Sequence, residues 1–142
     1  MEIELLKDKF TEVDVRALNP LVLAFIGDAV YEVFIRTHLV DLNRETCVNK
    51  LHRKTVEFVK AHSQCEIMNN IMDQLCEEEI AIFKRGRNTK SNTVPKSASV
   101  QDYRMATGFE ALIGFLYLTG RHERLNEIFK IILMKSKEEE IN

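Results

Sequence analysis

Three carboxylates stand inside two apolar stretches of the chain. Residues 21–35 contain Asp28 and Glu32 as their only charges, and residues 105–118 contain Glu110 alone. An ionised carboxylate in apolar surroundings is costly unless its pKa rises or a cation compensates it. Carboxylate oxygens are hard ligands that suit Mg²⁺ or Mn²⁺. The three acids therefore predict a metal site as one way of compensating their charge.

Helical geometry places these acids on defined faces. Asn19 followed by Pro20 is typical of an N-cap and first turn, and it predicts a helix that runs to about His38. Asp28 and Glu32 are one turn apart, so they share a face of this helix.

Glycines inside both apolar stretches indicate close helix packing. Gly27, Gly108 and Gly114 each cost about 1 kcal/mol relative to alanine in a helix, a cost usually offset where two backbones must approach. Two helices packed at these glycines would bring Asp28 and Glu110 together.

The remaining sequence predicts an all-α fold. Helical spacing of apolar residues covers 46–75, as one helix or as two broken near 62–63, and further helices are expected over 77–85, 100–119 and 123–136. Residues 87–99 are polar and predict a loop. With 142 residues, 45% of them hydrophobic, the chain predicts one domain with its core over about 19–135 and a solvated acidic tail at 138–140.

Composition excludes several classes of protein. Neither apolar stretch is long and uncharged enough to span a membrane, and residues 1–8 lack the features of a signal peptide, so a soluble cytoplasmic protein is expected. Cys47, Cys65 and Cys76 cannot form a disulfide framework or a C-x-x-C site, and we expect buried thiols. The four histidines are scattered and are expected at the surface or at helix ends.

Ordinary ion pairs are the alternative to a metal. Glu32 precedes Arg36 by four residues, which is the spacing of a structural pair on a helix. Asp28 and Glu110 also have basic residues as alternative partners: Arg16, Arg104 and His38.

The two acidic stretches resemble a known family. Residues 25–30 (Phe-Ile-Gly-Asp-Ala-Val) are similar to the signature of ribonuclease III catalytic domains, and residues 109–114 (Phe-Glu-Ala-Leu-Ile-Gly) are similar to their second acidic motif. The resemblance covers the chain from about Asn19 to Arg124. It implies that Asp28 and Glu110 bind Mg²⁺ and support the hydrolysis of double-stranded RNA.

Two departures narrow the resemblance. Full-length ribonuclease III has acids at the positions of Ala24 and Thr107, and a double-stranded RNA binding domain that this chain has no room for. These features, with residues 85–91 and 93–96, resemble the small bacterial branch called Mini-ribonuclease III. That branch implies a homodimeric endonuclease that trims precursor 23S ribosomal RNA, and assistance by a ribosomal protein stays open.

The mechanism expected is hydrolysis by a metal-activated water. Asp28 and Glu110 would be the ligands and could position that water, while Glu32 is a supporting candidate only. Two carboxylates can hold one Mg²⁺ that keeps several waters. A second ion would be coordinated mainly by RNA phosphate oxygens.

A basic segment supplies the expected RNA contacts. It is free of acids between residues 84 and 101, and cations of this kind bind RNA phosphates without base specificity. The alternative is a merely solvated loop, and the match to the family pattern favours RNA binding. The candidate RNA-binding residues are Lys84, Arg85, Arg87, Asn88, Lys90, Lys96 and Arg104.

The competing function for the whole protein is that of a non-catalytic structured-RNA-binding or ribosome-assembly protein.

Overall fold

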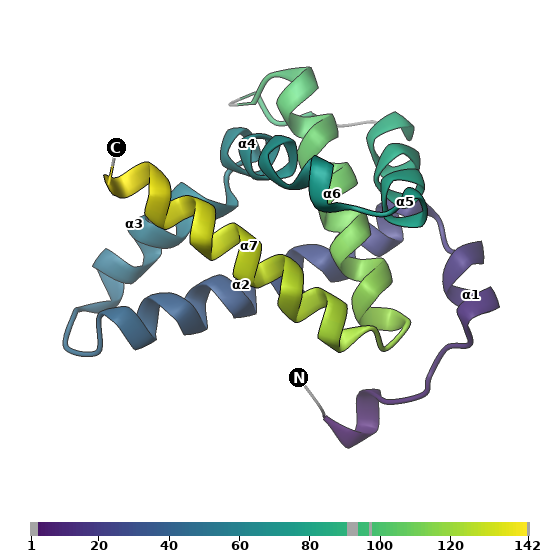
Figure 1. Cartoon of the computed structure of the whole chain (residues 1–142), viewed down its shortest axis with the longest axis horizontal. Coiled ribbons are helices and arrows are strands. Elements are labelled where there is room, and N and C mark those ends of the chain that lie inside the picture. Colours follow the sequence, from purple (N-terminus) through teal and green to yellow (C-terminus); the bar gives the residue numbers. More distant parts are fainter. Residues whose placement is uncertain (1–2, 91–93, 97, 142) are drawn as a thin grey trace.

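The computed structural model describes residues 3–90, 94–96 and 98–141, with side chains up to residue 136. The described residues form helices and no strand, which confirms the predicted all-α fold (Figure 1). Two short 3-10 helices, η1 and η2, accompany the α-helices. The elements are η1 (Glu4–Leu6), α1 (Glu12–Ala17), α2 (Pro20–Leu42), α3 (Val48–Val59), α4 (Ala61–Ile71), η2 (Met72–Gln74), α5 (Glu77–Asn88), α6 (Val100–Leu118) and α7 (His122–Ile141).

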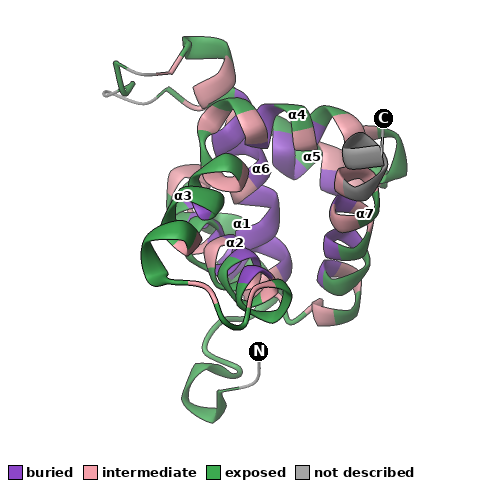
Figure 2. Cartoon of the chain, turned by 90° about the vertical axis from the view of Figure 1, so that its left-hand side faces the viewer, coloured by how far each residue is buried: buried purple, intermediate pink, exposed green. Residues whose placement is uncertain are grey.

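Helix α6 is the centre of the molecule. Every residue from Met105 to Leu116 is buried except Glu110, which is half-buried. Helices α2, α4, α5 and α7 surround it and turn their buried sides toward it (Figure 2). A helix that is apolar on all sides is stable when other helices cover it on all sides, so α6 explains the second apolar stretch of the sequence.

Helix α2 begins where the sequence predicts. The Asn19 side chain accepts a hydrogen bond of 2.8 Å from the backbone N–H of Leu21, and Pro20 occupies the first turn. The helix ends at Leu42, four residues later than predicted, because Leu39 continues the buried face. Asn43 then ends it, with its side-chain amide donating to the Leu39 carbonyl at 2.9 Å.

Several other helix boundaries differ from the sequence prediction. The stretch 46–75 is broken at Lys60, whose backbone is extended, two residues before the predicted break. Helix α5 continues past Gly86 to Asn88, since Gly86 is buried against α6 and does not cap the helix. Gly120, with φ of +72°, follows the end of α6 as predicted. Helix α7 extends to Ile141, and the side chains of the acidic tail lie outside the described ones.

The prediction of buried thiols is wrong for two of the three cysteines. Only Cys65 is buried, whereas Cys47 and Cys76 are exposed. Both exposed thiols belong to N-cap residues, of α3 and α5, where the extended backbone leaves the helix at the surface. Among the histidines, His52 and His62 are exposed, in line with the expectation of surface positions.

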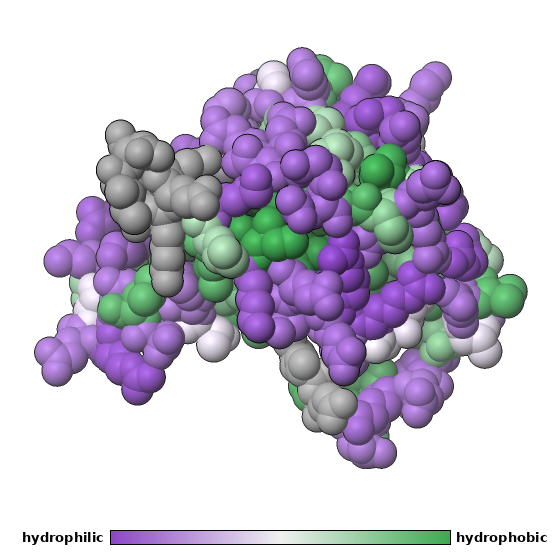
Figure 3. All heavy atoms as spheres, viewed as in Figure 1, coloured by the Kyte–Doolittle hydropathy of each residue, from purple (hydrophilic) through white to green (hydrophobic). Residues whose placement is uncertain are grey.

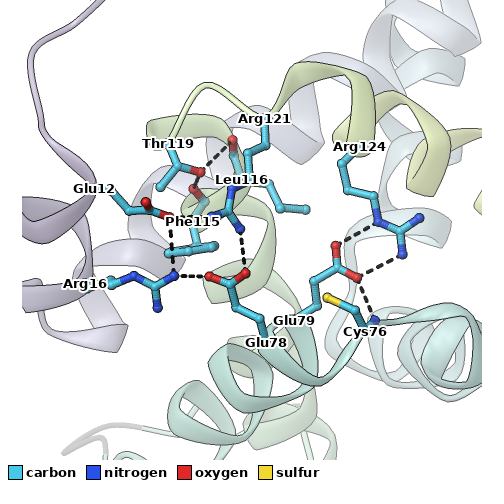
Figure 4. A network of polar contacts seen from close by, with 10 residues as sticks. All are labelled: Glu12, Arg16, Cys76, Glu78, Glu79, Phe115, Leu116, Thr119, Arg121 and Arg124. Atoms are coloured by element: carbon cyan, nitrogen blue, oxygen red, sulfur yellow. Dashed lines mark hydrogen bonds and ion pairs between the residues drawn. The ribbon is translucent and has the colours of Figure 1, made fainter.

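Ion pairs join the outer helices around one end of α6 (Figure 4). Arg16 of α1 and Arg121, just before α7, both pair with Glu78 of α5. Buried Glu79 pairs with Arg124 of α7 through Oε2 and Nε at 2.8 Å. These contacts hold α1, α5 and α7 together.

The surface on the side of α7 is largely hydrophilic, with hydrophobic side chains gathered toward its middle (Figure 3). Among the described helices, none is both long and apolar enough to cross a bilayer.

Candidate active site

Helices α2 and α6 touch backbone to backbone beside the acids. A Cβ added to Gly27 would lie 1.7 Å from the carbonyl oxygen of Glu110, and one added to Gly114 would lie 2.0 Å from that of Leu23. Neither position has room for a side chain, so the predicted close approach of the two helices is confirmed. Asp28 follows Gly27 directly, and the crossing brings it next to Glu110.

The pKa values of both carboxylates are raised. Burial raises the pKa of Glu110 to about 8, and the negative charge of Asp28 is the second cause. The pKa of Asp28 is raised as well, first by its apolar surroundings and then by Glu32, although its side chain stays open to solvent. Such a pair retains a proton near neutral pH unless a cation replaces it.

No cation of the described chain pairs with either carboxylate. The three basic residues considered as alternative partners are engaged or remote. Arg16 pairs with acids of α1 and α5, and His38 stacks on the ring of Phe34. Arg104 is exposed on α6 and pairs with neither acid. None of the three basic residues considered therefore compensates the charge of the pair.

Glu32 has a structural partner. Its Oε1 lies 2.8 Å from Nη2 of Arg36, which confirms the ion pair expected from their spacing. Glu32 still acts on the site through its charge, which raises the pKa of Asp28.

Asp28 and Glu110 are the two candidate ligands of the predicted metal site. Across the residues that the structure describes, no three acidic, histidine or cysteine side chains gather in a way that could hold a metal. Ala24 is buried at the first position where larger relatives carry an acid. Thr107, at the second, is buried and donates its hydroxyl to the Tyr103 carbonyl at 2.9 Å. Both positions are filled by packing and offer no free ligand.

Part of the predicted basic loop is helical. Arg85, Arg87 and Asn88 belong to the last turn of α5, because Gly86 packs against α6 and lets the helix continue. The Arg87 guanidinium lies 5.5 Å from the centre of the Phe83 ring, and its Nε donates to Asn88 Oδ1 at 3.0 Å. The end of α5 thus packs beside the helix that carries the half-buried acid.

The other basic candidates are spread along the surface. Lys84 is exposed on α5, Lys90 and Lys96 are exposed in the connection to α6, and Arg104 is exposed near the start of α6. Residues 91–93, which the sequence placed in the same segment, lie outside the described residues.

Two polar residues of α4 escaped the sequence analysis. His62 Nδ1 lies 3.1 Å from Asp102 Oδ2 and joins α4 to the start of α6. Gln64 is buried and lies close to Glu110. Gln64 shares a helix face with Met68 and Ile71. A polar residue on an otherwise apolar helix face could have predicted that Gln64 is buried.

Comparisons with known proteins agree with this architecture. The family model of the Ribonuclease III domain matches residues 21–121. A Mini-ribonuclease 3 of Clostridium tetani is 60% identical over 128 residues, which are 90% of this chain and 85% of the relative. A Mini-ribonuclease 3 of a Thermoanaerobacter species is 55% identical over 121 residues, 85% of this chain and 84% of the relative. A crystal structure of a Fusobacterium nucleatum protein, 33% identical, has a TM-score of 0.77 and covers 88% of this chain and 99% of its own.

The helical domain with these matches is an endoribonuclease domain, a hydrolase that acts on RNA. The chain belongs to the ribonuclease III family, in the branch of the Mini-ribonuclease 3 proteins. That family acts on double-stranded RNA and generally depends on divalent metal ions. Membership favours an enzyme over the non-catalytic RNA-binding protein that the sequence left as the alternative.

Proposed function

We propose that the chain is a Mg²⁺-dependent endonuclease of double-stranded RNA that matures precursor 23S ribosomal RNA in the cytoplasm. Asp28 and Glu110 are its catalytic carboxylates and hold the divalent ion, for which Mn²⁺ can substitute. The observation that carries this proposal is the α2–α6 crossing, where the backbones meet at Gly27 and Glu110, the charge of Asp28 raises the pKa of Glu110, and no cation of the described chain pairs with either carboxylate.

The chemistry of the pair fits a hard divalent cation. Carboxylate oxygens are the ligands that Mg²⁺ prefers, and two of them suit an ion that keeps several waters. Once bound, the ion supplies a more acidic water and offsets the charge of the phosphate. Asp28, open to solvent, faces the incoming RNA, while Glu110 is held by the buried helix behind it.

The basic residues around the end of α5 support duplex binding. A-form RNA is recognised mainly through its phosphates and 2′-hydroxyls, which cations and amides can contact without reading bases. Lys84, Arg85, Arg87, Asn88, Lys90, Lys96 and Arg104 are proposed to make these contacts.

A homodimer is part of the proposal. Helix α2 leaves Val22, Phe25 and Val33 exposed at helical spacing, with Phe25 exposed by 77%. Exposed apolar side chains on one helix face favour a self-complementary interface with a second copy of the chain. Two sites related by a two-fold axis could then act on the two strands of one duplex.

The test compares the wild type with Asp28→Asn and Glu110→Gln on a structured RNA in Mg²⁺. Both variants are expected to bind the RNA with unchanged affinity and to cut it at least about 100-fold more slowly, because they remove ligands. Glu32→Gln is the matched control, since it removes a carboxylate of α2 that already has a partner. Equal cleavage by all four proteins would contradict the assignment.

A further inference from the structure

His62 is an exposed histidine whose ring contacts a carboxylate at each of its two nitrogens. Its Nδ1 lies 3.1 Å from Asp102 Oδ2 of α6, and its Nε2 lies 3.0 Å from Glu66 Oε1, one turn further along α4. A neutral imidazole has one N–H and can donate to only one of these acceptors, whereas the imidazolium donates to both. The arrangement of the two carboxylates therefore fits the protonated ring.

The charges next to the ring favour the same state. The hydrogen bond to Asp102 is the main cause that raises the pKa of His62 above its ordinary value of 6.5, and the negative charge of Glu66 is the second. Burial, and then Asp102, raise the pKa of the nearby Cys65 thiol, so this neighbour stays uncharged. The imidazolium of His62 is thus placed between two carboxylates from two different helices.

Helices α3 and α7 add charges around Glu66. Glu57 of α3 and Lys135 of α7 line one cleft together with Glu66. Glu57 also pairs with Lys60 at 3.3 Å. Because Glu57 and Lys135 carry opposite charges, their effects on Glu66 oppose each other, and Asp102 and Glu66 remain the main influences on the ring.

The contact with Asp102 joins the first turn of α6 to α4. The buried residues of α6 begin at Met105, so residues 100–103 contribute none to the core. The turn is capped by Ser99, whose hydroxyl accepts a hydrogen bond of 3.0 Å from the backbone N–H of Asp102. Arg104, a candidate RNA-binding residue, stands directly after it and is exposed. The link therefore acts where the basic segment enters α6.

We propose that His62 is a positioning residue for RNA binding, whose protonated ring bridges Glu66 and Asp102 and so holds the start of α6 against α4. This inference rests on the proposed binding of RNA by the basic segment. A ring without its proton can keep only one of the two contacts, and the charges of both carboxylates are then no longer offset near Arg104. Both changes weaken the attraction of this surface for RNA phosphates.

The direction of the pH dependence follows from the raised pKa of the folded ring. The link is complete below the unfolded value of 6.5 and is lost as pH rises through the higher folded value. Duplex binding should therefore weaken over the same interval of pH.

The experiment uses the full chain and an RNA duplex kept uncleaved by EDTA, with affinity measured by fluorescence anisotropy between about pH 6 and pH 8.5. Over this range the affinity of the wild type should fall about two- to fivefold more than that of His62→Gln, the size expected for exposed ion pairs. Glu110 titrates in every protein compared, so it does not contribute to the difference. The control is His52→Gln, which removes another exposed histidine, on α3, and should keep the wild-type profile.

Asp102→Asn separates positioning from direct contact of the ring with RNA. It leaves His62 in place and removes the carboxylate of α6, so the variant should bind RNA with the shallow pH profile of His62→Gln. Proton NMR of the His62 ring should also show a lower pKa in this variant than in the wild type. Circular dichroism checks that each variant is folded.

A wild-type pH profile in Asp102→Asn would overturn the inference, since His62 would then act on RNA without its partner on α6. A ring that titrates alike in the wild type and in Asp102→Asn would overturn it as well. A wild type that binds no duplex at any pH would overturn the proposed RNA-binding surface instead, and the NMR titration would still decide whether Asp102 holds the proton on His62.

Discussion

Glu110 is a half-buried carboxylate whose charge should depend on pH when no metal is bound. The unfolded chain releases its proton near the ordinary value of 4.5, whereas the folded chain holds it up to about pH 8. Between these values the folded state binds more protons, so the free energy of unfolding falls as pH rises. Each unit of pKa difference corresponds to about 1.4 kcal/mol.

Because the free energy of unfolding of the wild type falls as pH rises, Glu110→Gln should change the pH dependence of stability. In EDTA the variant should be more stable than the wild type at pH 8, and the two should converge toward pH 4, where the carboxyl is protonated in both states. Urea unfolding followed by circular dichroism at several pH values measures the difference. Glu32→Gln should not show the same trend, because Glu32 has Arg36 as a partner. Parallel curves for wild type and Glu110→Gln would contradict the buried, proton-holding state of this residue.

Whether the sequence could predict a contact of the site depends on how far apart its two residues are along the chain. The pair of Glu32 and Arg36 follows from local helix spacing, so it could be predicted. The meeting of Asp28 and Glu110 is long-range, yet glycines at the crossing marked where the backbones approach. The hydrogen bond between His62 and Asp102 depends on how α4 packs against α6, and no local pattern in the sequence specifies that packing.

At the scale of elements, the last turn of α5 is the part of the basic segment with defined geometry. The sequence predicted a helix ending at Gly86, because glycine often follows a helix end. The structure uses Gly86 differently, since a Cβ there would come within 2.8 Å of the Ala111 Cβ of α6. Glycine can end a helix or allow a neighbouring helix to pack closely. Only the residues packed against it show which of the two applies. The result is that Arg85 and Arg87 extend from a helix anchored to α6.

The double variant Arg85→Ala and Arg87→Ala tests this surface. Each phosphate-binding cation contributes about 0.9 to the slope of log K against log salt, so the loss of two should flatten the slope by about 1.8. Binding of an uncleaved duplex in EDTA, measured by fluorescence anisotropy at several salt concentrations, gives affinity and slope together. Lys130→Ala on α7 is the control, since Lys130 is exposed and outside the basic segment. Unchanged affinity and slope in the double variant would remove the end of α5 from the RNA surface.

At the scale of the whole molecule, α2 carries both an exposed apolar face and Asp28, so a dimer formed through this face would use the helix that carries the proposed active site. The first apolar stretch is hydrophobic nearly all round, and α6 covers only part of it. Val22, Phe25 and Val33 remain open to solvent in the single chain. Burial of such side chains contributes about 25 cal/mol per Å², so a second copy that covers them would gain from each one.

Phe25→Glu is therefore expected to convert a homodimer into a folded monomer. Phe25 is exposed by 77%, so the substitution leaves the core of the single chain intact, while at a two-fold interface it places two unpaired charges in apolar surroundings. Light scattering after gel filtration at micromolar concentration measures the mass, and circular dichroism checks the fold. Val13→Glu is the matched control, because Val13 of α1 is equally exposed at 77% but lies on another helix. A monomer can offer a duplex only one pair of carboxylates. The Phe25 variant should therefore cut the two strands in separate encounters and accumulate nicked duplex. A wild type that is itself monomeric and fully active would rule out the dimer.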